Sequence, residues 1–226
     1  MKVLAIDTAL GACAAAVLDS RAGAMLAAES QGMVRGHAEA LMPLIARVMD
    51  AGRCEFADLD RIAVTVGPGS FTGLRVGIAA ARAIALAAGK PAIGLSTLSA
   101  LTAPHVAARQ DHIILAAIDA RNEQVYFQVF APNGTTIVTP RLDRVRAAVI
   151  AVPTGPTIIT GSGAELVAAA WPSRGTPPRI DVRAAPDIGW VARLGAAAQD
   201  EGAPPKPLYL RRPDARPQDG NRLPRR

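Results

Sequence analysis

A short apolar segment that ends in an aspartate occurs once in each half of this 226-residue chain. The first runs from Val3 to Asp7 and the second from Ile113 to Asp119. In both halves the following segments have the pattern of a hairpin partner, a third strand, a helix and a further strand. These segments cover residues 12–18, 24–29, 37–50 and 61–66 in the first half, and residues 124–130, 135–138, 142–150 and 157–160 in the second. The repeated order predicts two related lobes.

The expected fold class is α/β, with two mixed sheets flanked by helices. Each lobe resembles ribonuclease H, and the duplication of such a lobe gives the two-lobed, actin-like architecture of actin and the sugar kinases. We expect the first lobe to cover residues 1–104 and a smaller second lobe to cover residues 105–187. Residues 188–206 are predicted to hold a helix that returns to the first lobe, and residues 207–226 a basic tail rich in proline and arginine.

Positive charge is concentrated at the carboxyl end of the sequence. The formal net charge is +6, but the last sixteen residues hold six arginines and two aspartates, which leaves +2 for residues 1–210. A solvated tail is therefore favoured over a nucleic-acid-binding one. Two cysteines and no recognisable export segment indicate a reducing, cytoplasmic setting. The most apolar helical segment, Val76 to Ala88, is expected to be too short and too weakly apolar to span a membrane.

Two aspartates and two glycine turns are candidates for a nucleotide cleft between the lobes. Acidic side chains at strand ends can hold a metal–nucleotide complex. A glycine turn before a helix can bind a phosphate with its backbone amides. The candidate residues are Asp7, Gly67, Gly69, Ser70, Asp119, Gly161 and Gly163. The same residues are also explained by glycines that turn the chain and by solvated strand ends, and GPGSFTGLR lacks the lysine of a P-loop.

Side chains for metal or nucleophilic catalysis are sparse in the sequence. A catalytic zinc needs about three protein ligands, and the chain has three histidines in total. His37 is followed one turn later by Leu41, so a histidine pair is not formed on that helix. Neither Cys13 nor Cys54 has a neighbour in sequence that would lower the pKa of its thiol. We therefore expect no catalytic residue, no metal and no cofactor.

Two helical segments carry apolar or small residues that suit close packing. In the segment 71–88, Gly73, Gly77, Ala81 and Ala85 form a stripe at intervals of four residues. In the segment 37–50, Pro43 predicts a start near Leu41 or a kink, and the apolar band is wider than one contact needs. This band includes His37, Leu41, Leu44, Ile45 and Val48. Both segments are interpreted as a surface for another protein chain, while packing against the protein's own sheet stays open as the alternative.

Several segments together resemble the TsaB family, the dimerisation subunits of the bacterial complex that makes threonylcarbamoyladenosine in tRNA. They are LAIDTALGACAAAVL, the H-x-E-x-L-x-P-L-I segment at His37 to Ile45, GPGSFTGLRVG, the serine-rich Gly94 to Ala100, IDARNEQVY and PLYLR. The resemblance runs from residue 2 to about residue 212. GPGSFTGLR and IDARNEQVY are highly specific in combination, and the arginine-rich residues beyond Arg212 lie outside the resemblance.

This resemblance implies an actin-like fold, a cytoplasmic setting and a non-catalytic role. TsaB-like proteins bind the catalytic subunit TsaD through helices of the first lobe, here residues 37–50 and 71–88. They also recruit the ATPase TsaE at that junction and can form homodimers when TsaD is absent. The complex transfers a threonylcarbamoyl group to the adenosine beside the tRNA anticodon, so contact with tRNA is expected to be indirect. TsaB-like proteins lack the metal-binding histidine pair of TsaD, which agrees with Leu41.

Two other functions fit parts of the sequence. An actin-class kinase or ATPase would use Asp7, Asp119 and the two glycine turns. A tRNA-binding module would depend on the basic residues 211–226 and would show strongly salt-dependent affinity for RNA. The sequence favours the scaffold subunit because of the stripe of small residues in the segment 71–88, the missing metal ligands and the set of motifs that resembles the TsaB family.

Overall fold

The first sheet of the protein has five strands in the order β3-β2-β1-β4-β5. We analysed a computed structural model of the chain, which describes residues 1–173, 176–200 and 202–211. Strand β1 pairs antiparallel with β2 and parallel with β4, so the sheet is mixed. Its strands are β1 (Lys2–Asp7), β2 (Ala12–Asp19), β3 (Ala24–Gly32), β4 (Arg61–Gly67) and β5 (Ala92–Ser96). Strands β1 and β2 are buried almost throughout, because helices cover both faces of the sheet.

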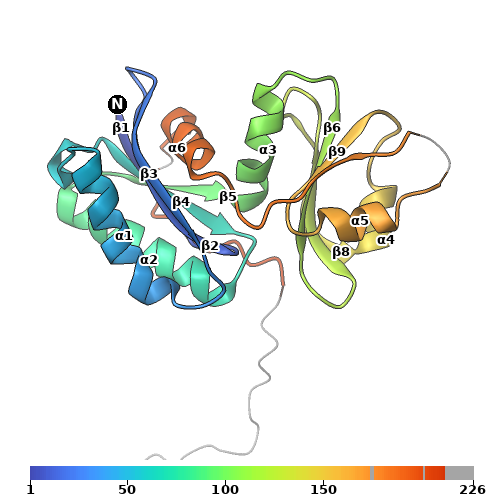
Figure 1. Cartoon of the computed structure of the whole chain (residues 1–226), viewed down its shortest axis with the longest axis horizontal. Coiled ribbons are helices and arrows are strands. Elements are labelled where there is room, and N and C mark those ends of the chain that lie inside the picture. Colours follow the sequence, from blue (N-terminus) through green and yellow to red (C-terminus); the bar gives the residue numbers. More distant parts are fainter. Residues whose placement is uncertain (174–175, 201, 212–226) are drawn as a thin grey trace, which may run out of the picture.

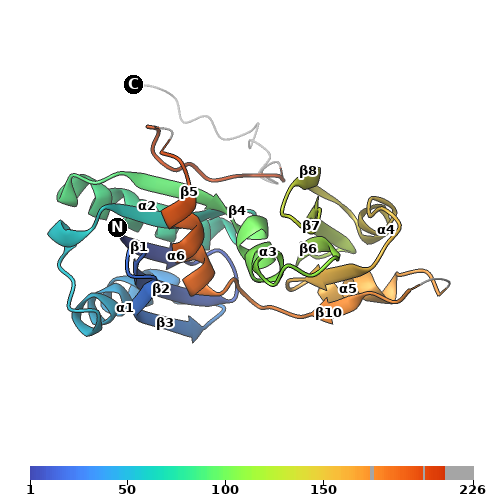
Figure 2. The same ribbon diagram turned by 90° about the horizontal axis from the view of Figure 1, so that it is seen from above.

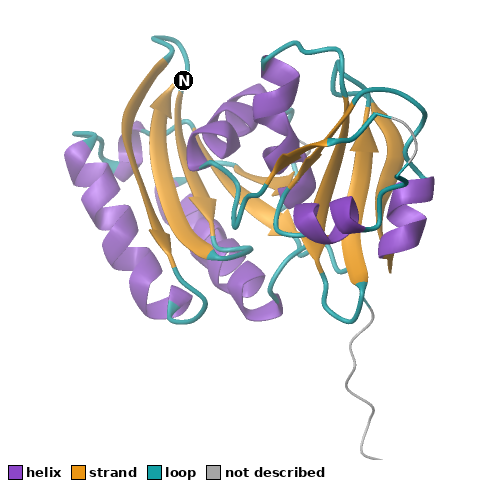
Figure 3. Cartoon of the chain, turned by 45° about the vertical axis from the view of Figure 1, so that its right-hand side comes forward, coloured by secondary structure: helices purple, strands orange, loops and turns teal. Residues whose placement is uncertain are grey.

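The second sheet repeats this topology strand for strand. Its order is β10-β9-β6-β7-β8, and β6 pairs antiparallel with β7 and parallel with β9. Its strands are β6 (Ile113–Asp119), β7 (Gln124–Phe130), β8 (Thr136–Arg144), β9 (Thr157–Thr160) and β10 (Arg179–Asp181). The predicted two-lobed, duplicated α/β fold is therefore confirmed, and Figures 1 and 3 show the two sheets side by side with helices packed on them. We call the part built on β1–β5 the first lobe and the part built on β6–β10 the second lobe.

Two helices, α1 (His37–Ala51) and α2 (Phe71–Ala88), pack together on one face of the first sheet, and α6 (Ile188–Ala197) packs on the other face against β1 and β2. Helix α3 (Thr97–Ala107) contacts both α6 and β6, so it lies between the lobes, as Figure 1 shows. The remaining helices are α4 (Val145–Ile150) and α5 (Ala164–Ala169) of the second lobe and the short 3-10 helix η1 (Phe56–Asp58).

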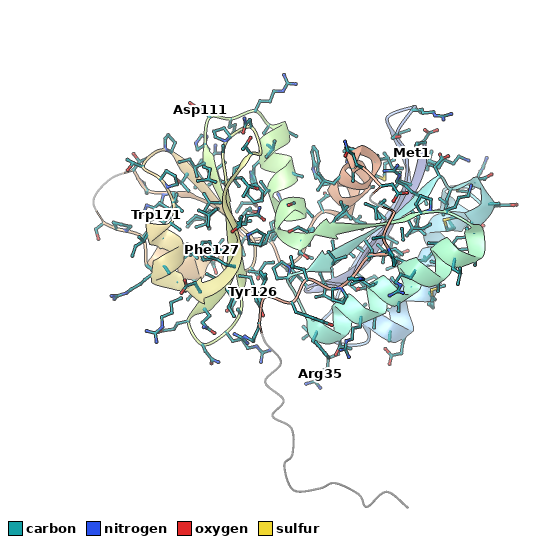
Figure 4. The ribbon with its side chains drawn as sticks, turned by 180° about the vertical axis from the view of Figure 1, so that it is seen from behind. Met1, Arg35, Asp111, Tyr126, Phe127 and Trp171 are labelled. Carbon is teal, nitrogen blue, oxygen red and sulfur yellow. The ribbon has the colours of Figure 1, made fainter. Side chains whose placement is uncertain are left out.

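Each lobe has its own apolar core. In the second lobe the largest fully buried side chain is Phe127, and Trp171 packs partly buried at the edge of the same core (Figure 4). Tyr126, the neighbour of Phe127 in the strand, points to the opposite face of the sheet and packs against the cluster that α3 forms with β6. The two faces of the second sheet thus serve different purposes: one closes its own core and the other joins the first lobe.

Helix α2 coincides with the predicted helical segment 71–88. The expectation of a segment too short to span a membrane concerned residues 76–88 alone, whereas all 18 residues of α2 are by length and composition apolar enough to cross one. One face of the helix is nevertheless buried against β4 within the first lobe. A long apolar helix of this kind is typical of the core of a folded lobe.

Candidate functional site

Asp7 lies at the end of β1 and its side chain is completely buried. Its Oδ1 atom accepts hydrogen bonds from the Thr65 hydroxyl and from the amide of Ala9 at 3.1 Å. Its Oδ2 atom has no hydrogen-bond partner among the described residues. Burial raises the pKa of Asp7 to about 6, although these hydrogen bonds act in the opposite direction. The carboxyl group is thus held inside the lobe and does not project into an open cleft.

The first glycine turn packs directly on the chain that follows Asp7. The amide of Ser70 donates a hydrogen bond of 2.7 Å to the carbonyl oxygen of Ala9, and a Cβ atom on Gly69 would collide with that same oxygen. The hydroxyl of Ser70 caps α2 by accepting from the amide of Gly73 at 3.3 Å. Gly67 has a φ of 118°, a conformation that favours glycine. This turn is shaped by its contact with β1.

The second glycine turn meets its own strand in the same way. The amide of Gly163 donates to the carbonyl oxygen of Ala117 at 3.0 Å, and a Cβ atom on Gly161 would collide with that oxygen. Ser162 accepts through its hydroxyl from the amide of Asp119 at 3.2 Å. The side chain of Asp119 is exposed and its Oδ1 atom accepts from the amide of Arg121 at 2.7 Å. The two lobes therefore share this contact between turn and strand.

These contacts explain both glycine turns without a bound phosphate. In each turn, at least one amide that could face an anion already donates to a carbonyl oxygen of the chain itself. The glycines are needed because the backbones approach too closely for any side chain. A nucleotide cleft that includes Asp7 and Asp119 stays a prediction, and the geometry of the turns does not require it.

The two cysteines and His37 lie in buried surroundings that do not activate them for catalysis. Burial raises the pKa of Cys13 to about 11 and also raises that of Cys54, so neither thiol is activated as a nucleophile. His37 is buried, and its Nε2 atom lies 3.3 Å from the carbonyl oxygen of Leu10. Within the described residues, no group of three or more histidine, cysteine or carboxylate side chains is arranged to hold a metal ion.

The small-residue stripe of α2 faces the protein's own first lobe. A Cβ atom on Gly73 would collide with the carbonyl oxygen of Thr8, and one on Gly77 with the Thr8 hydroxyl. That hydroxyl donates a hydrogen bond of 2.7 Å to the carbonyl oxygen of Gly73. Ala81 and Ala85 are buried in the same core. The interpretation of this stripe as a partner surface is wrong, since the sheet and the turn after β1 fill the space in front of it.

The apolar band of α1 is corrected for the same reason. Its members are at most 8% exposed, and all but the histidine belong to the core between α1, α2 and the sheet. They are His37, Leu41, Leu44, Ile45 and Val48. A residue buried in its own lobe cannot form the surface that meets another chain. The sequence missed this because core packing and partner packing produce the same helical spacing.

A different set of residues forms the outward side of the two helices. Met42 is 49% exposed and Leu86 is 86% exposed, and α1 and α2 carry further small apolar residues at exposed or half-buried positions. We call this set the outer face: Ala38, Met42, Val76, Ala79, Ala83 and Leu86. The signal was present in the sequence as apolar residues on the side of each helix away from its buried stripe. Figure 1 shows α1 and α2 side by side on the outside of the first lobe.

The duplicated sheets, with a buried aspartate ending β1 and its counterpart ending β6, define a two-lobed protein of the actin-like class. The structure matches an uncharacterized Pseudomonas aeruginosa protein with similarity to the peptidase YEAZ with a TM-score of 0.79, at 26% identity over 93% of this chain and 99% of that one. A likeness to the EutJ protein of Carboxydothermus hydrogenoformans (TM-score 0.50, 13% identity, 87% and 89% covered) concerns the fold alone.

The sequence comparisons agree with the structural one. The family described as TsaD, tRNA N6-adenosine threonylcarbamoyltransferase, matches residues 23–171. An uncharacterized protein of Mycobacterium tuberculosis is 34% identical over 220 residues, which is 95% of this chain and 94% of that protein. The tRNA threonylcarbamoyladenosine biosynthesis protein TsaB of Escherichia coli is 37% identical over 129 residues, 56% of this chain and 54% of that protein. The chain belongs to this threonylcarbamoyltransferase-related family, as a TsaB-like member.

Proposed function

We propose that this chain is a non-catalytic scaffold subunit in the biosynthesis of threonylcarbamoyladenosine in tRNA. In this role it binds a TsaD-like catalytic subunit, which transfers the threonylcarbamoyl group to the adenosine beside the anticodon. The printed names of its relatives and the matching family support the pathway. The proposal that a partner protein binds rests on the outer face of α1 and α2. Apolar residues as exposed as Met42 and Leu86 mark a protein interaction surface when they form one patch.

The shape of the outer face suits a helical partner. Ala79 and Ala83 are short, so a second helix can approach α2 closely, while Met42 is flexible and adapts to the surface opposite. The buried stripes of α1 and α2 hold both helices firmly on the sheet, which fixes the outer face before a partner arrives. A preformed surface loses little conformational entropy on binding. We further propose that the same face permits homodimers when the catalytic subunit is absent, and that a TsaE-like ATPase joins at this junction in the cytoplasm.

A scaffold role also agrees with the interior of the lobes. The glycine turns are occupied by backbone contacts, both thiols have raised pKa values, and Asp7 is sealed from solvent. These observations support a subunit that contributes surface to a complex and leaves the chemistry to its partner.

The interface is tested with the purified chain and the TsaD-like protein of the same organism. Size-exclusion chromatography with light scattering should show a heterodimer, and the double variant Met42→Glu, Ala79→Glu should weaken it at least tenfold. Ala169→Glu, an equally exposed alanine on α5, is the matched control and should bind like the parent chain. Thermal unfolding of all variants should coincide. No heterodimer, or normal tRNA modification in the absence of this chain, would overturn the proposal.

One observation favours the alternative of an actin-class kinase or ATPase. The Oδ2 atom of Asp7 is buried and has no hydrogen-bond partner in the part of the chain that the structure describes, so it could meet a metal–nucleotide complex if the lobes opened. Calorimetry with ATP and magnesium separates the two functions. Tight binding, with turnover that Asp7→Asn abolishes, would support the alternative over the scaffold.

A further inference from the structure

The described end of the chain, residues 203–211, runs along the edge of the first lobe and reaches the second. Pro205 is buried near Gly94 of β5, and the amide of Leu208 donates a hydrogen bond of 2.7 Å to the carbonyl oxygen of Val66. Arg211 then donates to the carbonyl oxygen of Ala120 at 3.0 Å, in the second lobe. Figure 2 shows this segment, in red, passing along α2 and β5 towards the second sheet.

A row of cationic side chains accompanies this segment. Arg75 and Arg82 of α2 are exposed and seven residues apart, which is about 10 Å along the helix and only about 20° around it. Arg82 and Lys90 line one cavity together with residues 202–204, and Lys206 is exposed on the segment itself. We call Arg75, Arg82, Lys90, Lys206 and Arg211 the cationic edge. None of the five is in an ion pair with a carboxylate of the described residues.

The surroundings of the cationic edge hold little negative charge. The sequence contains no aspartate or glutamate between Asp60 and Asp111, a stretch that includes all of α2, β5 and α3. Among the described residues that line the cavity with Arg82 and Lys90, Asp200 is the one carboxylate. The cationic edge borders the outer face. Val76 and Ala83 lie about 100° around α2 from Arg75 and Arg82, but Ala83 and Leu86 line the same cavity as Arg82 and Lys90. Helix α2 therefore carries apolar and positive residues next to each other.

Two aromatic rings contact Arg75 of the cationic edge. Phe71 and Tyr209 are stacked with their centroids 5.5 Å apart, and they are 52% and 45% exposed. The guanidinium of Arg75 lies 3.7 Å from the centre of the Phe71 ring, and its Nε atom donates to the Tyr209 hydroxyl at 3.1 Å. Half-exposed rings beside guanidinium groups are the surface on which unpaired nucleobases stack, with the phosphates held by the flanking cations.

We propose that the cationic edge binds single-stranded or looped RNA directly, with a base stacked at Phe71 and Tyr209. This inference rests on the proposed function, because the tRNA of that complex is the natural occupant. It replaces the expected indirect contact with tRNA, through the catalytic subunit, by direct contact between this chain and the RNA. An acidic protein surface would satisfy the charges but would leave the paired aromatic rings without a specific role, so RNA is favoured.

The test uses the full chain and a fluorescein-labelled RNA hairpin with the sequence of a tRNA anticodon stem–loop. Fluorescence anisotropy at several salt concentrations gives the affinity and its salt dependence. The double variant Arg75→Gln, Arg82→Gln should lower the affinity at least tenfold and reduce the salt slope by about 1.4, the value for two phosphate contacts to a single strand. Arg144→Gln, Arg146→Gln is the matched control, since it removes two exposed arginines from the second lobe. Tyr209→Leu should weaken binding with little change in the slope.

Three outcomes would overturn the proposal. They are no binding of the hairpin, an equal loss in the control variant, and tighter binding of a polyglutamate peptide than of the hairpin. A chain that ends at Arg211 separates the tail from the edge: residual affinity that Arg75→Gln, Arg82→Gln still lowers supports the proposal, and complete loss contradicts it. The heterodimer assay is run on the same variants. RNA binding without a heterodimer would overturn the scaffold function alone, and a heterodimer without RNA binding would overturn this inference alone.

Discussion

The hydroxyl of Thr65, on β4, donates a hydrogen bond to the carboxyl oxygen of Asp7 on the neighbouring strand β1. The bond joins two buried side chains at the end of β1. It stabilises the ionised form of Asp7 only in part, since burial still raises the pKa of this carboxyl to about 6. The balance between these two effects makes the stability of the lobe sensitive to pH.

Asp7 should make the protein less stable as the pH rises. Its pKa is higher in the folded chain than the 3.8 of a free aspartate, so the folded state holds its proton more tightly between these values. Stability is therefore lost as the pH rises from about 4 through 6, by about 3 kcal/mol in total. In Asp7→Asn this loss should disappear. Urea unfolding at pH 5 and pH 8 measures about half of this loss, because the other half has already occurred by pH 5. Asp50→Asn on α1 is the exposed control, and an unchanged pH dependence in Asp7→Asn would contradict the assignment.

Gly77→Leu should unfold the first lobe and not merely block a partner. Even the Cβ atom at this position would collide with the Thr8 hydroxyl, so a larger side chain must push α2 off the sheet. Overpacking of this kind costs about 1–3 kcal/mol or more. Thermal unfolding monitored by circular dichroism detects the loss. Gly32→Ala is the control, because a Cβ atom there meets nothing within 4 Å; a Gly77→Leu chain as stable as this control would show that α2 is not seated as described.

Asp181 should stabilise the second lobe when it is ionised, so its contribution is lost as the pH falls, whereas that of Asp7 is lost as the pH rises. Burial disfavours its charge, but hydrogen bonds from Arg183, Thr160 and His105 outweigh burial and lower its pKa. The stabilisation is present above pH 4 and is lost as the pH falls through the lowered pKa. At pH 7, Asp181→Asn should cost about 1–3 kcal/mol, and the difference from the parent chain should shrink below pH 4. A difference that stays constant down to pH 3 would contradict the ionised state of Asp181.

Arg61→Met should loosen helix α6. One guanidinium nitrogen of Arg61 donates to the carbonyl oxygens of Gly195 and Ala198, at 3.0 and 2.6 Å, where α6 ends. Carbonyl groups at a helix end lack partners within the helix, so loss of this donor should cost about 1–3 kcal/mol. Hydrogen exchange should increase in α6 and stay unchanged in α4 and α5. Uniform protection in both lobes would show that Arg61 does not hold the helix.

The repeated order of strands was predictable because each lobe begins with a buried strand that ends in aspartate. The residues at which helices and strands begin and end were less predictable. The segment 142–150 was predicted as a helix from its apolar spacing, but β8 continues to Arg144 and α4 begins only at Val145. Pro140 lies within β8, which is possible because β8 is an edge strand. Helix α1 begins at His37, not near Leu41, and contains Pro43 at an exposed position.

The sequence did not predict which side of helix α2 faces solvent and which side faces the protein's own core. Gly73 and Gly77 indicate a close approach, but the approaching group, Thr8, comes from a turn 65 residues away from Gly73. The role of residues 203–211 was missed as well. Proline-rich, irregular chain has no periodicity, and its contacts with Val66, Phe71 and Ala120 depend on how the lobes are folded. The local sequence patterns thus predicted the strands and helices of each lobe. The exposed surfaces depend on how those elements pack together, which the local patterns do not contain.

The path of residues 203–211 has a mechanical consequence. Leu208 and Tyr209 hold this segment on the first lobe, and Arg211, two residues after Tyr209, donates to Ala120 and Gln124 of the second. Any swing of one lobe away from the other must break the two hydrogen bonds of Arg211. Residues 203–211 therefore connect the two lobes a second time, in addition to helix α3.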